Sequence, residues 1–156
     1  MRSTMNRPAQ LFAEDLRVGL RFRGAEKPLT EDRFRQFADM TGDAHPIHYD
    51  PAYAARTKFG RPIAHGLLLT SLTALGATDM SHALEDSMIA MIEQHWQFRN
   101  PAFVGDVVVA DYEVRSNVAT SNARSAKIEI GVTLRNQSGT ALLEGCHTYL
   151  IRRRTG

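Results

Sequence analysis

The second half of the chain alternates between apolar and polar residues with a period of two. The clearest run has apolar side chains at every second position: Ala126, Ile128, Ile130, Val132 and Leu134. An equivalent run is Val108, Ala110, Tyr112 and Val114. Successive side chains of a strand point to opposite faces of a sheet. These runs therefore predict strands with one buried face and one solvated face.

Two further strands flank these runs. From Asp86 onward the helical period gives way to alternation, and Ile92, Gln94, Trp96 and Phe98 are expected to share one strand face. The stretch Asn136–Gly139 (NQSG) predicts a turn, and 141–151 returns as the last strand. Strands joined by short turns pair antiparallel.

Helical patterns precede the strands. Thr30 is expected to cap a helix with Phe34 and Phe37 on its apolar face, and Gly42 is expected to end it. A leucine-rich segment follows at Leu67, Leu68, Leu69, Leu72 and Leu75. A helix that is apolar nearly all round is usually buried.

This order predicts an α+β fold, in which a curved antiparallel sheet wraps around one long central helix. At 156 residues the chain is expected to form a single domain over 1–156, with about 1–10 as a loose N-terminal tail. A chain of this length can bury a core without disulfide staples.

Composition narrows the function. A net charge of +2 does not favour nucleic-acid or membrane partners, and no apolar run approaches the roughly 20 residues of a membrane span. Cys146 is the only cysteine, which suits a reducing compartment. No signal-peptide core is seen at the N-terminus. We expect a cytoplasmic protein.

The stretch TGDAHPIHYD, Thr41–Asp50, has the densest chemistry. It places Asp43, His45 and His48 around Pro46, which is expected to hold its neighbourhood extended. Three interpretations are open: an acid–base pair, a metal site built from the acid and both histidines, or a surface loop. A metal site would need a further ligand at tight spacing, and none is evident.

Three stretches together resemble a known family. GDAHPIHYD (Gly42–Asp50), RPIAHG (Arg61–Gly66) and NPAFVGD (Asn100–Asp106) resemble the hydratase-2 motif of the MaoC-like dehydratases, which include the (R)-specific enoyl-CoA hydratases. The resemblance covers nearly the whole chain beyond the tail. It implies the hotdog fold, which matches the predicted sheet and helix order.

The resemblance also implies a reaction. Asp43 and His48 correspond to the catalytic pair, and the Gly66 N–H corresponds to the donor to the thioester oxygen. The substrate would be a 2-enoyl thioester of coenzyme A or an acyl carrier protein, hydrated reversibly to the 3-hydroxyacyl form, the (R) form in the family named. No cofactor or metal is implied. Two copies would join edge to edge as a homodimer or a multiple of it.

The chain departs from the family in two places. His45 stands where Asn is common, and Ala74 stands where some members carry Ser. Both positions bear on substrate choice. Acyl chain length, the carrier, the direction of the reaction and the role of His45 are left open.

The chemistry can be argued from the residues as well. Adding water to a conjugated thioester needs a proton acceptor, a proton donor to the α-carbon, and a donor for the charge on the carbonyl oxygen. A carboxylate and an imidazole can supply the first two. The amide of Gly66, at a helix start, can supply the third.

Three more residues are candidates for substrate binding. His65 precedes Gly66 and is expected to pack near the pocket. Gln94 is a polar residue on an otherwise apolar strand face. The alternative interpretation is that its side-chain amide is buried and serves a structural role. Arg61, with Arg56 and Lys58, could bind the phosphates of coenzyme A. The alternative interpretation is that these residues form a solvated basic segment.

Two other functions compete with the hydratase. A hotdog thioesterase would use a carboxylate to activate water against the carbonyl carbon. A non-catalytic subunit would only bind acyl thioesters. The paired acid and histidine of DAHPIH favour the hydratase over both.

Overall fold

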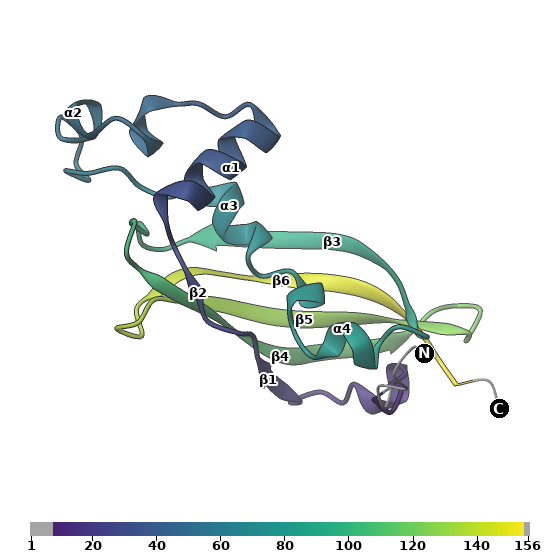
Figure 1. Cartoon of the computed structure of the whole chain (residues 1–156). Helices are drawn as coiled ribbons and strands as arrows, with labels where there is room; N and C mark the ends of the chain where they lie inside the picture. Colours follow the sequence, from purple (N-terminus) through teal and green to yellow (C-terminus); the bar gives the residue numbers. More distant parts are fainter. Residues whose placement is uncertain (1–7, 155–156) are drawn as a thin grey trace, which may run out of the picture.

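The computed structural model describes residues 8–154, and its largest element is a six-stranded antiparallel sheet. The strands are β1 (Arg21–Arg23), β2 (Lys27–Pro28), β3 (Met88–Phe98), β4 (Val107–Ala119), β5 (Ser125–Arg135) and β6 (Ala141–Arg152). Their order is β1-β4-β5-β6-β3, and β2 also pairs with β4 (Figure 1). The predicted antiparallel sheet is confirmed.

The alternation along the strands decides which face is buried. On β5, Ala126, Ile128, Ile130, Val132 and Leu134 are each at most 2% exposed. On β4, Val108, Ala110, Tyr112 and Val114 are each at most 3% exposed. These residues form the core together with residues of the helical segments. Removing their apolar surface from water is the main stabilising contribution of this layer.

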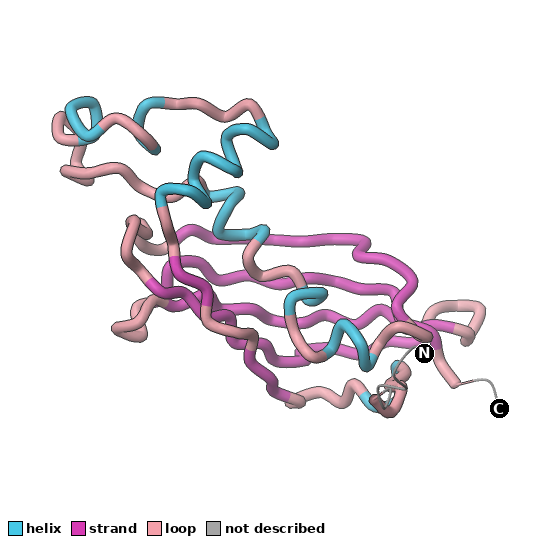
Figure 2. Tube along the Cα trace, viewed as in Figure 1, coloured by secondary structure: helices cyan, strands magenta, loops and turns pink. Residues whose placement is uncertain are grey.

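The helical segments lie on one side of the sheet (Figure 2). They are η1 (Ala13–Asp15), α1 (Glu31–Thr41), η2 (Pro46–His48), α2 (Pro51–Ala54), α3 (Gly66–Ser71), η3 (Leu75–Ala77) and α4 (Met80–Ala83). The chain from α3 to α4 crosses the sheet face, while α1 lies above the end of β3 in the view and α2 lies farther out (Figure 1). Among the described residues, no helix is long and apolar enough to span a bilayer.

Helix α1 follows the predicted signals. The Thr30 side chain accepts a hydrogen bond from the Arg33 N–H at 3.2 Å, which caps the first turn. Phe34 and Phe37 are 1% and 6% exposed. Gly42 ends the helix with φ +77°, a left-handed conformation that glycine adopts without steric cost.

The central helix is shorter than predicted. It covers only Gly66–Ser71 and continues as the separate turns η3 and α4. The hydroxyls of Thr70, Ser71 and Thr73 donate to carbonyls three residues earlier, at 2.9, 2.7 and 2.6 Å. Such bonds compete with the helical ladder and weaken a long helix. The prediction that the leucine-rich segment is buried is also wrong for Leu67, which is 68% exposed.

Two regions complete the fold. Residues 1–7 of the expected tail lie outside the described residues, whereas Gln10 donates to the His82 carbonyl at 2.7 Å.

At the opposite side of the sheet from β1, β3 is an edge strand that pairs with β6 alone. Most of β3 is exposed, including the apolar residues Ile89, Met91, Ile92 and Phe98.

Candidate active site

The motif stretch folds as a chain of capped turns between α1 and α2. The Asp43 Oδ1 accepts from the His45 N–H at 3.2 Å, and the His45 Nδ1 accepts from the Ile47 N–H at 3.3 Å. Pro46 begins the 3-10 helix η2, so the predicted extended conformation is found at His45 before it but is wrong for Pro46–His48. Proline fits the first position of a helical turn because no N–H is needed there.

These turns bring Asp43 and His48 together with His65. One side-chain oxygen or nitrogen of each residue lies within 4.8 Å of those of the other two. The imidazole rings of His48 and His65 are stacked, with centroids 3.8 Å apart and planes 25° apart. The predicted pair is therefore accompanied by a third titratable group from the start of α3.

One hydrogen bond fixes the protonation of the neutral His48 ring. The Nδ1 atom lies 2.7 Å from the Ile63 carbonyl oxygen. A carbonyl can only accept, so Nδ1 carries the proton and donates it. The Nε2 atom then holds the lone pair, and His48 is oriented as a proton acceptor at Nε2.

His65 occupies a more enclosed place and is 2% exposed. Its ring packs against Phe37 and Phe34 of α1, with centroids at 4.8 and 5.9 Å. Its Nε2 atom is hydrogen-bonded to the Tyr49 hydroxyl. Burial lowers the pKa of His65, and the adjacent His48 lowers it further. His65 is therefore held in its neutral form.

Gly66 lies at the start of α3, directly after His65. The Leu69 N–H donates to the His65 carbonyl at 3.1 Å, so the amide of Gly66 precedes the first intrahelical bond. A Cβ atom on Gly66 would lie 2.9 Å from Cε1 of Phe98. Glycine therefore also allows the Phe98 ring of β3 to approach the helix start.

Two cavities flank the cluster. One, of about 410 Å³, is lined by His48, Tyr49 and Arg61 together with residues of α1. The other, of about 340 Å³, is lined by Gly66, Phe98, Lys58 and their neighbours. His48 and Gly66, the predicted amide donor, thus border two different hollows, each large enough for part of a ligand.

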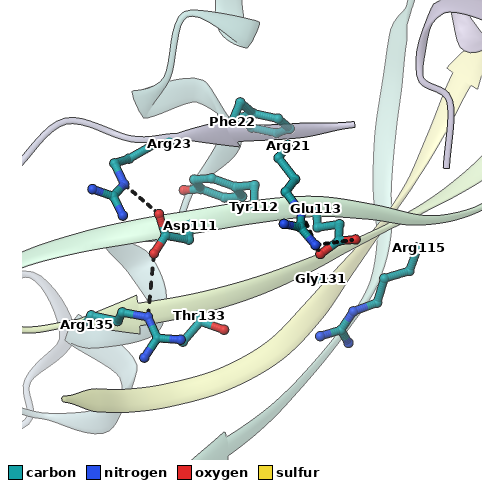
Figure 3. A pocket seen from close by; sticks show the side chains of 10 residues that line it. All are labelled: Arg21, Phe22, Arg23, Asp111, Tyr112, Glu113, Arg115, Gly131, Thr133 and Arg135. Carbon is teal, nitrogen blue, oxygen red and sulfur yellow. Dashed lines mark hydrogen bonds and ion pairs between the residues drawn. The ribbon is translucent and has the colours of Figure 1, made fainter. Parts of the chain in front are cut away.

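A larger cavity of about 530 Å³ lies elsewhere, between β1, β4 and β5 (Figure 3). Most of its charged side chains pair with one another. Arg23 and Arg135 contact Asp111 at 2.6 and 3.6 Å, and Arg21 contacts Glu113 at 3.2 Å. This cavity contains none of the predicted site residues, so size alone does not identify the site.

The remaining predicted residues differ in position. Arg61 borders the cavity of His48, and its guanidinium lies 3.9 Å from the Phe103 ring centroid. Gln94 is exposed on β3, where its Oε1 accepts from the Trp96 indole N–H at 2.8 Å. Gln94 borders neither cavity of the cluster.

Two residues of the cluster were missed by sequence reasoning. Tyr49 lies inside the motif stretch, and its hydroxyl is 2.8 Å from the Asp43 carbonyl oxygen. Its position between two motif residues was the only available signal. Phe98 was assigned to a strand face, but nothing in the sequence indicated its contact with Gly66.

The third resembling stretch serves the fold. The Asp106 side chain accepts from the Phe103 N–H at 2.9 Å and from the Gln137 amide at 3.0 Å. Gly105 has φ +96°, which favours glycine. These bonds hold the turn into β4.

The geometry fits an acid–base cluster better than a metal centre. The trio with grouped ligand atoms contains His65, whereas the metal hypothesis used His45. Ring-nitrogen lone pairs lie in the ring plane, so stacked rings direct them side by side rather than toward one ion at about 2.0–2.1 Å. In addition, His48 Nδ1 and His65 Nε2 are already hydrogen-bonded.

With the sheet and this cluster described, comparison with known proteins assigns the class. The family model of the MaoC like domain matches residues 17–136. The chain belongs to the MaoC-like domain family, and its fold is the hotdog fold that the motif resemblance implied.

Individual relatives agree with this assignment. An (R)-specific enoyl-CoA hydratase of Aeromonas caviae is 39% identical over 104 residues, which is 67% of this chain and 75% of that protein. A 3-hydroxybutyryl-CoA dehydratase of Methylorubrum extorquens is 38% identical over 67% of this chain and 64% of that protein. The predicted enzyme class, a hydratase/dehydratase, is confirmed at that level.

Solved structures give the same result. The A. caviae (R)-hydratase superposes with a TM-score of 0.71 at 31% identity, covering 90% of this chain and 99% of that one. An Archaeoglobus protein described as a monoamine oxidase regulatory protein gives a TM-score of 0.87 at 30% identity, covering 96% and 99%.

Proposed function

We propose that this protein reversibly hydrates a 2-enoyl thioester, with coenzyme A as the carrier, to the (R)-3-hydroxyacyl thioester. The observation that carries the proposal is the pairing of Asp43 with a His48 whose Nδ1–H is committed to the Ile63 carbonyl. The carrier and the stereochemistry are taken from the A. caviae relative, which is an (R)-specific enoyl-CoA hydratase.

Asp43 and His48 divide the proton transfers. A water molecule held between them loses a proton to one of the pair while its oxygen adds to the β-carbon. A proton from the pair is delivered to the α-carbon, and the enzyme returns to its starting protonation state. A positioned acid or base contributes typically 10²–10⁴ in rate.

The Gly66 N–H stabilises the charge that builds on the thioester oxygen. A backbone donor of this kind needs no side chain and no reorganisation during the reaction. Arg61 borders the same cavity as His48, and we assign it to the carrier phosphates. His65 stacks on His48 of the reacting pair, whereas Gln94 borders neither cavity of the cluster and is not assigned to substrate contact within one chain.

The active form is proposed to be a homodimer of single-domain chains. The exposed edge of β3 has 11 residues and carries Ile89, Met91, Ile92 and Phe98, which are 42–56% exposed. A long apolar edge strand is a template for pairing with another chain. Light scattering should give twice the 17.4 kDa chain mass, and a monomer at micromolar concentration would contradict this.

A panel of 2-enoyl-CoA substrates tests the reaction itself. Hydration removes the absorbance of the conjugated thioester without releasing free thiol. Release of free thiol would identify a thioesterase instead. Saturable binding with neither change would identify a non-catalytic subunit. A chiral separation of the 3-hydroxyacyl product then tests the (R) assignment.

A further inference from the structure

His65 and Tyr49 link the two halves of the site. The Tyr49 hydroxyl lies 2.8 Å from the Asp43 carbonyl oxygen and is also hydrogen-bonded to Nε2 of His65. His65 is followed in the chain by Gly66. A continuous path therefore runs from the backbone of Asp43, through Tyr49 and His65, to the amide assigned to the thioester oxygen.

The hydrogen-bond directions along this path are determined. A hydroxyl has one proton, and the carbonyls of Asp43 and Phe34, at 2.8 and 3.3 Å, can only accept, so the Tyr49 hydroxyl donates toward these carbonyls. The Tyr49 oxygen then accepts from His65, which must carry its proton on Nε2. Burial raises the pKa of the Tyr49 phenol, so it keeps its proton.

The other nitrogen of His65 confirms why the ring stays neutral. Its Nδ1 is buried and has no hydrogen-bond partner among the described residues. A proton placed there would be buried without an acceptor, which is costly. The titratable groups facing His65 are His48, Asp43 and Tyr49, while α1 contributes the Phe34 and Phe37 rings.

We propose that His65 and Tyr49 are positioning residues: together they hold His48 and Asp43 at a fixed separation from the Gly66 amide. The stacked His65 ring restricts rotation of His48, and the Tyr49 hydrogen bonds tie the motif turn to the start of α3. His65 remains neutral through the reaction, so the transferred proton resides on His48 or Asp43. This inference rests on the proposed function, because the positioned groups are its catalytic ones.

Nuclear magnetic resonance tests the arrangement without any substrate. Long-range proton–nitrogen spectra should show His65 as the Nε2–H form and His48 as the Nδ1–H form, two opposite tautomers in one stack. Because burial lowers the pKa of His65, its ring should remain neutral as the pH falls through the ordinary histidine range. The same tautomer in both rings, or a His65 ring that becomes charged in the ordinary histidine range, would overturn the proposal even if the hydratase activity were confirmed.

Kinetics tests the positioning. Tyr49→Phe removes only the hydroxyl and should lower kcat by on the order of 10- to 100-fold with little change in KM, because the reacting groups lose alignment. It should also remove the acceptor of the His65 Nε2–H, so that the His65 ring no longer keeps one preferred tautomer. Tyr53→Phe is the matched control on nearby α2, and it should keep the parental kcat.

Two His65 variants separate the contributions of the ring. His65→Gln keeps a donor for Tyr49 but loses the stack, while His65→Phe keeps the stack but loses the donor. Each should retain more activity than His65→Ala. Parental kcat in Tyr49→Phe together with an unchanged His65 tautomer would overturn the proposal. Absence of hydratase activity in the parent, with the predicted tautomers present, would instead overturn only the proposed function.

Discussion

The sheet and the motif segment of this protein are built in different ways. In the sheet, most residues' places follow from a repeating rule, and β4, β5 and β6 pair antiparallel over long stretches with one register shift in each pair, at Val114–Ser116 and at Leu134–Arg135. In the segment 42–66, each position depends on one particular bond, such as the His48 Nδ1 bond to the Ile63 carbonyl or the Ile63 N–H bond to the Ile47 carbonyl at 3.2 Å.

This difference separates stability from chemistry. Burial of many apolar side chains supports the sheet collectively, so one loss there should reduce the free energy of unfolding. The motif segment contributes few large buried side chains but holds the reacting groups. A change at the reacting groups of this segment should reduce the rate while leaving the fold intact. The following predictions test that division from the largest expected effect to the smallest.

The largest effect is expected at the paired acid and histidine. Asp43→Asn keeps the shape and removes the charge, and His48→Gln keeps a polar reach and removes the ring. Each should lower the hydration rate by on the order of 10²–10⁴. The rate loss in the double variant should be far smaller than the product of the two single losses, because the effects of residues that act as a unit are not additive.

The control for this pair is thermal or denaturant unfolding, which should match the parent closely. A folded Asp43→Asn protein with near-parental hydration would show that the assignment of the pair is wrong. If the two single effects multiply in the double variant, the residues act in separate steps.

The reverse behaviour is expected in the sheet. Ile130 is 1% exposed, so Ile130→Ala should reduce the free energy of unfolding by about 2–5 kcal/mol through lost burial and a cavity. Denaturant titration measures this, and the rate per folded molecule should stay parental. Val118 is 61% exposed on β4, and Val118→Ala should change stability by less than about 0.5 kcal/mol.

A histidine inside the sheet layer gives a pH test. Burial lowers the pKa of His147 to about 4, and its Nε2 lies 3.0 Å from the Thr73 hydroxyl. The unfolded chain, with an ordinary histidine pKa near 6.5, binds more protons between these values. His147 therefore contributes stability above about pH 6.5, and that contribution is lost as the pH falls toward 4.

The loss should amount to roughly 3 kcal/mol across that window, by the linkage between pKa and stability. Denaturant titrations at several pH values should show the decrease in the parent and a flatter profile in His147→Phe. Equal pH dependence in both proteins would assign the acid sensitivity to other groups.

Gly66 lies where the two regions meet, so its two roles can be separated. Gly66→Ala places a methyl group 2.9 Å from Phe98, and it also crowds the proposed approach of the thioester. We expect the rate to fall on the order of tenfold as alignment is lost. Adding Phe98→Leu should relieve the packing conflict and restore stability but not the rate. Recovery of the rate as well would show that Gly66 serves packing only.

The sequence was informative where a local rule determined the structure. The period of two located the strands and their buried faces, and Thr30 and Gly42 bounded α1. The leucine spacing, by contrast, predicted a longer helix than α3, because side-chain hydroxyl groups compete for the helical carbonyls. It also predicted burial for Leu67, which is exposed. The spacing of apolar residues carries no information on side-chain hydrogen bonds that compete with the helix.

The site was predictable only as far as its motif. The side chains of Asp43, His48 and His65 lie together, and Gly66 follows His65 in the chain, but Tyr49 joins them through bonds to partners up to 16 residues away. Such contacts depend on how α1 and α3 pack, which no local period encodes. Gln94 shows the opposite case, because an inward-looking position in the pattern proved exposed on an edge strand.

The smallest effect is expected at His45. Its Nδ1 caps η2 by accepting from the Ile47 N–H, and an asparagine side chain can accept the same bond. Its ring centroid lies 6.3 Å from that of His48, without stacking. His45→Asn should therefore leave kcat within about twofold of the parent, since changes away from the reacting groups have small effects, and should at most alter preference among acyl chains. Steady-state rates for a short and a longer 2-enoyl-CoA, with and without a chelator, measure this. A metal site using His45 requires the opposite result, in which both the substitution and the chelator abolish hydration.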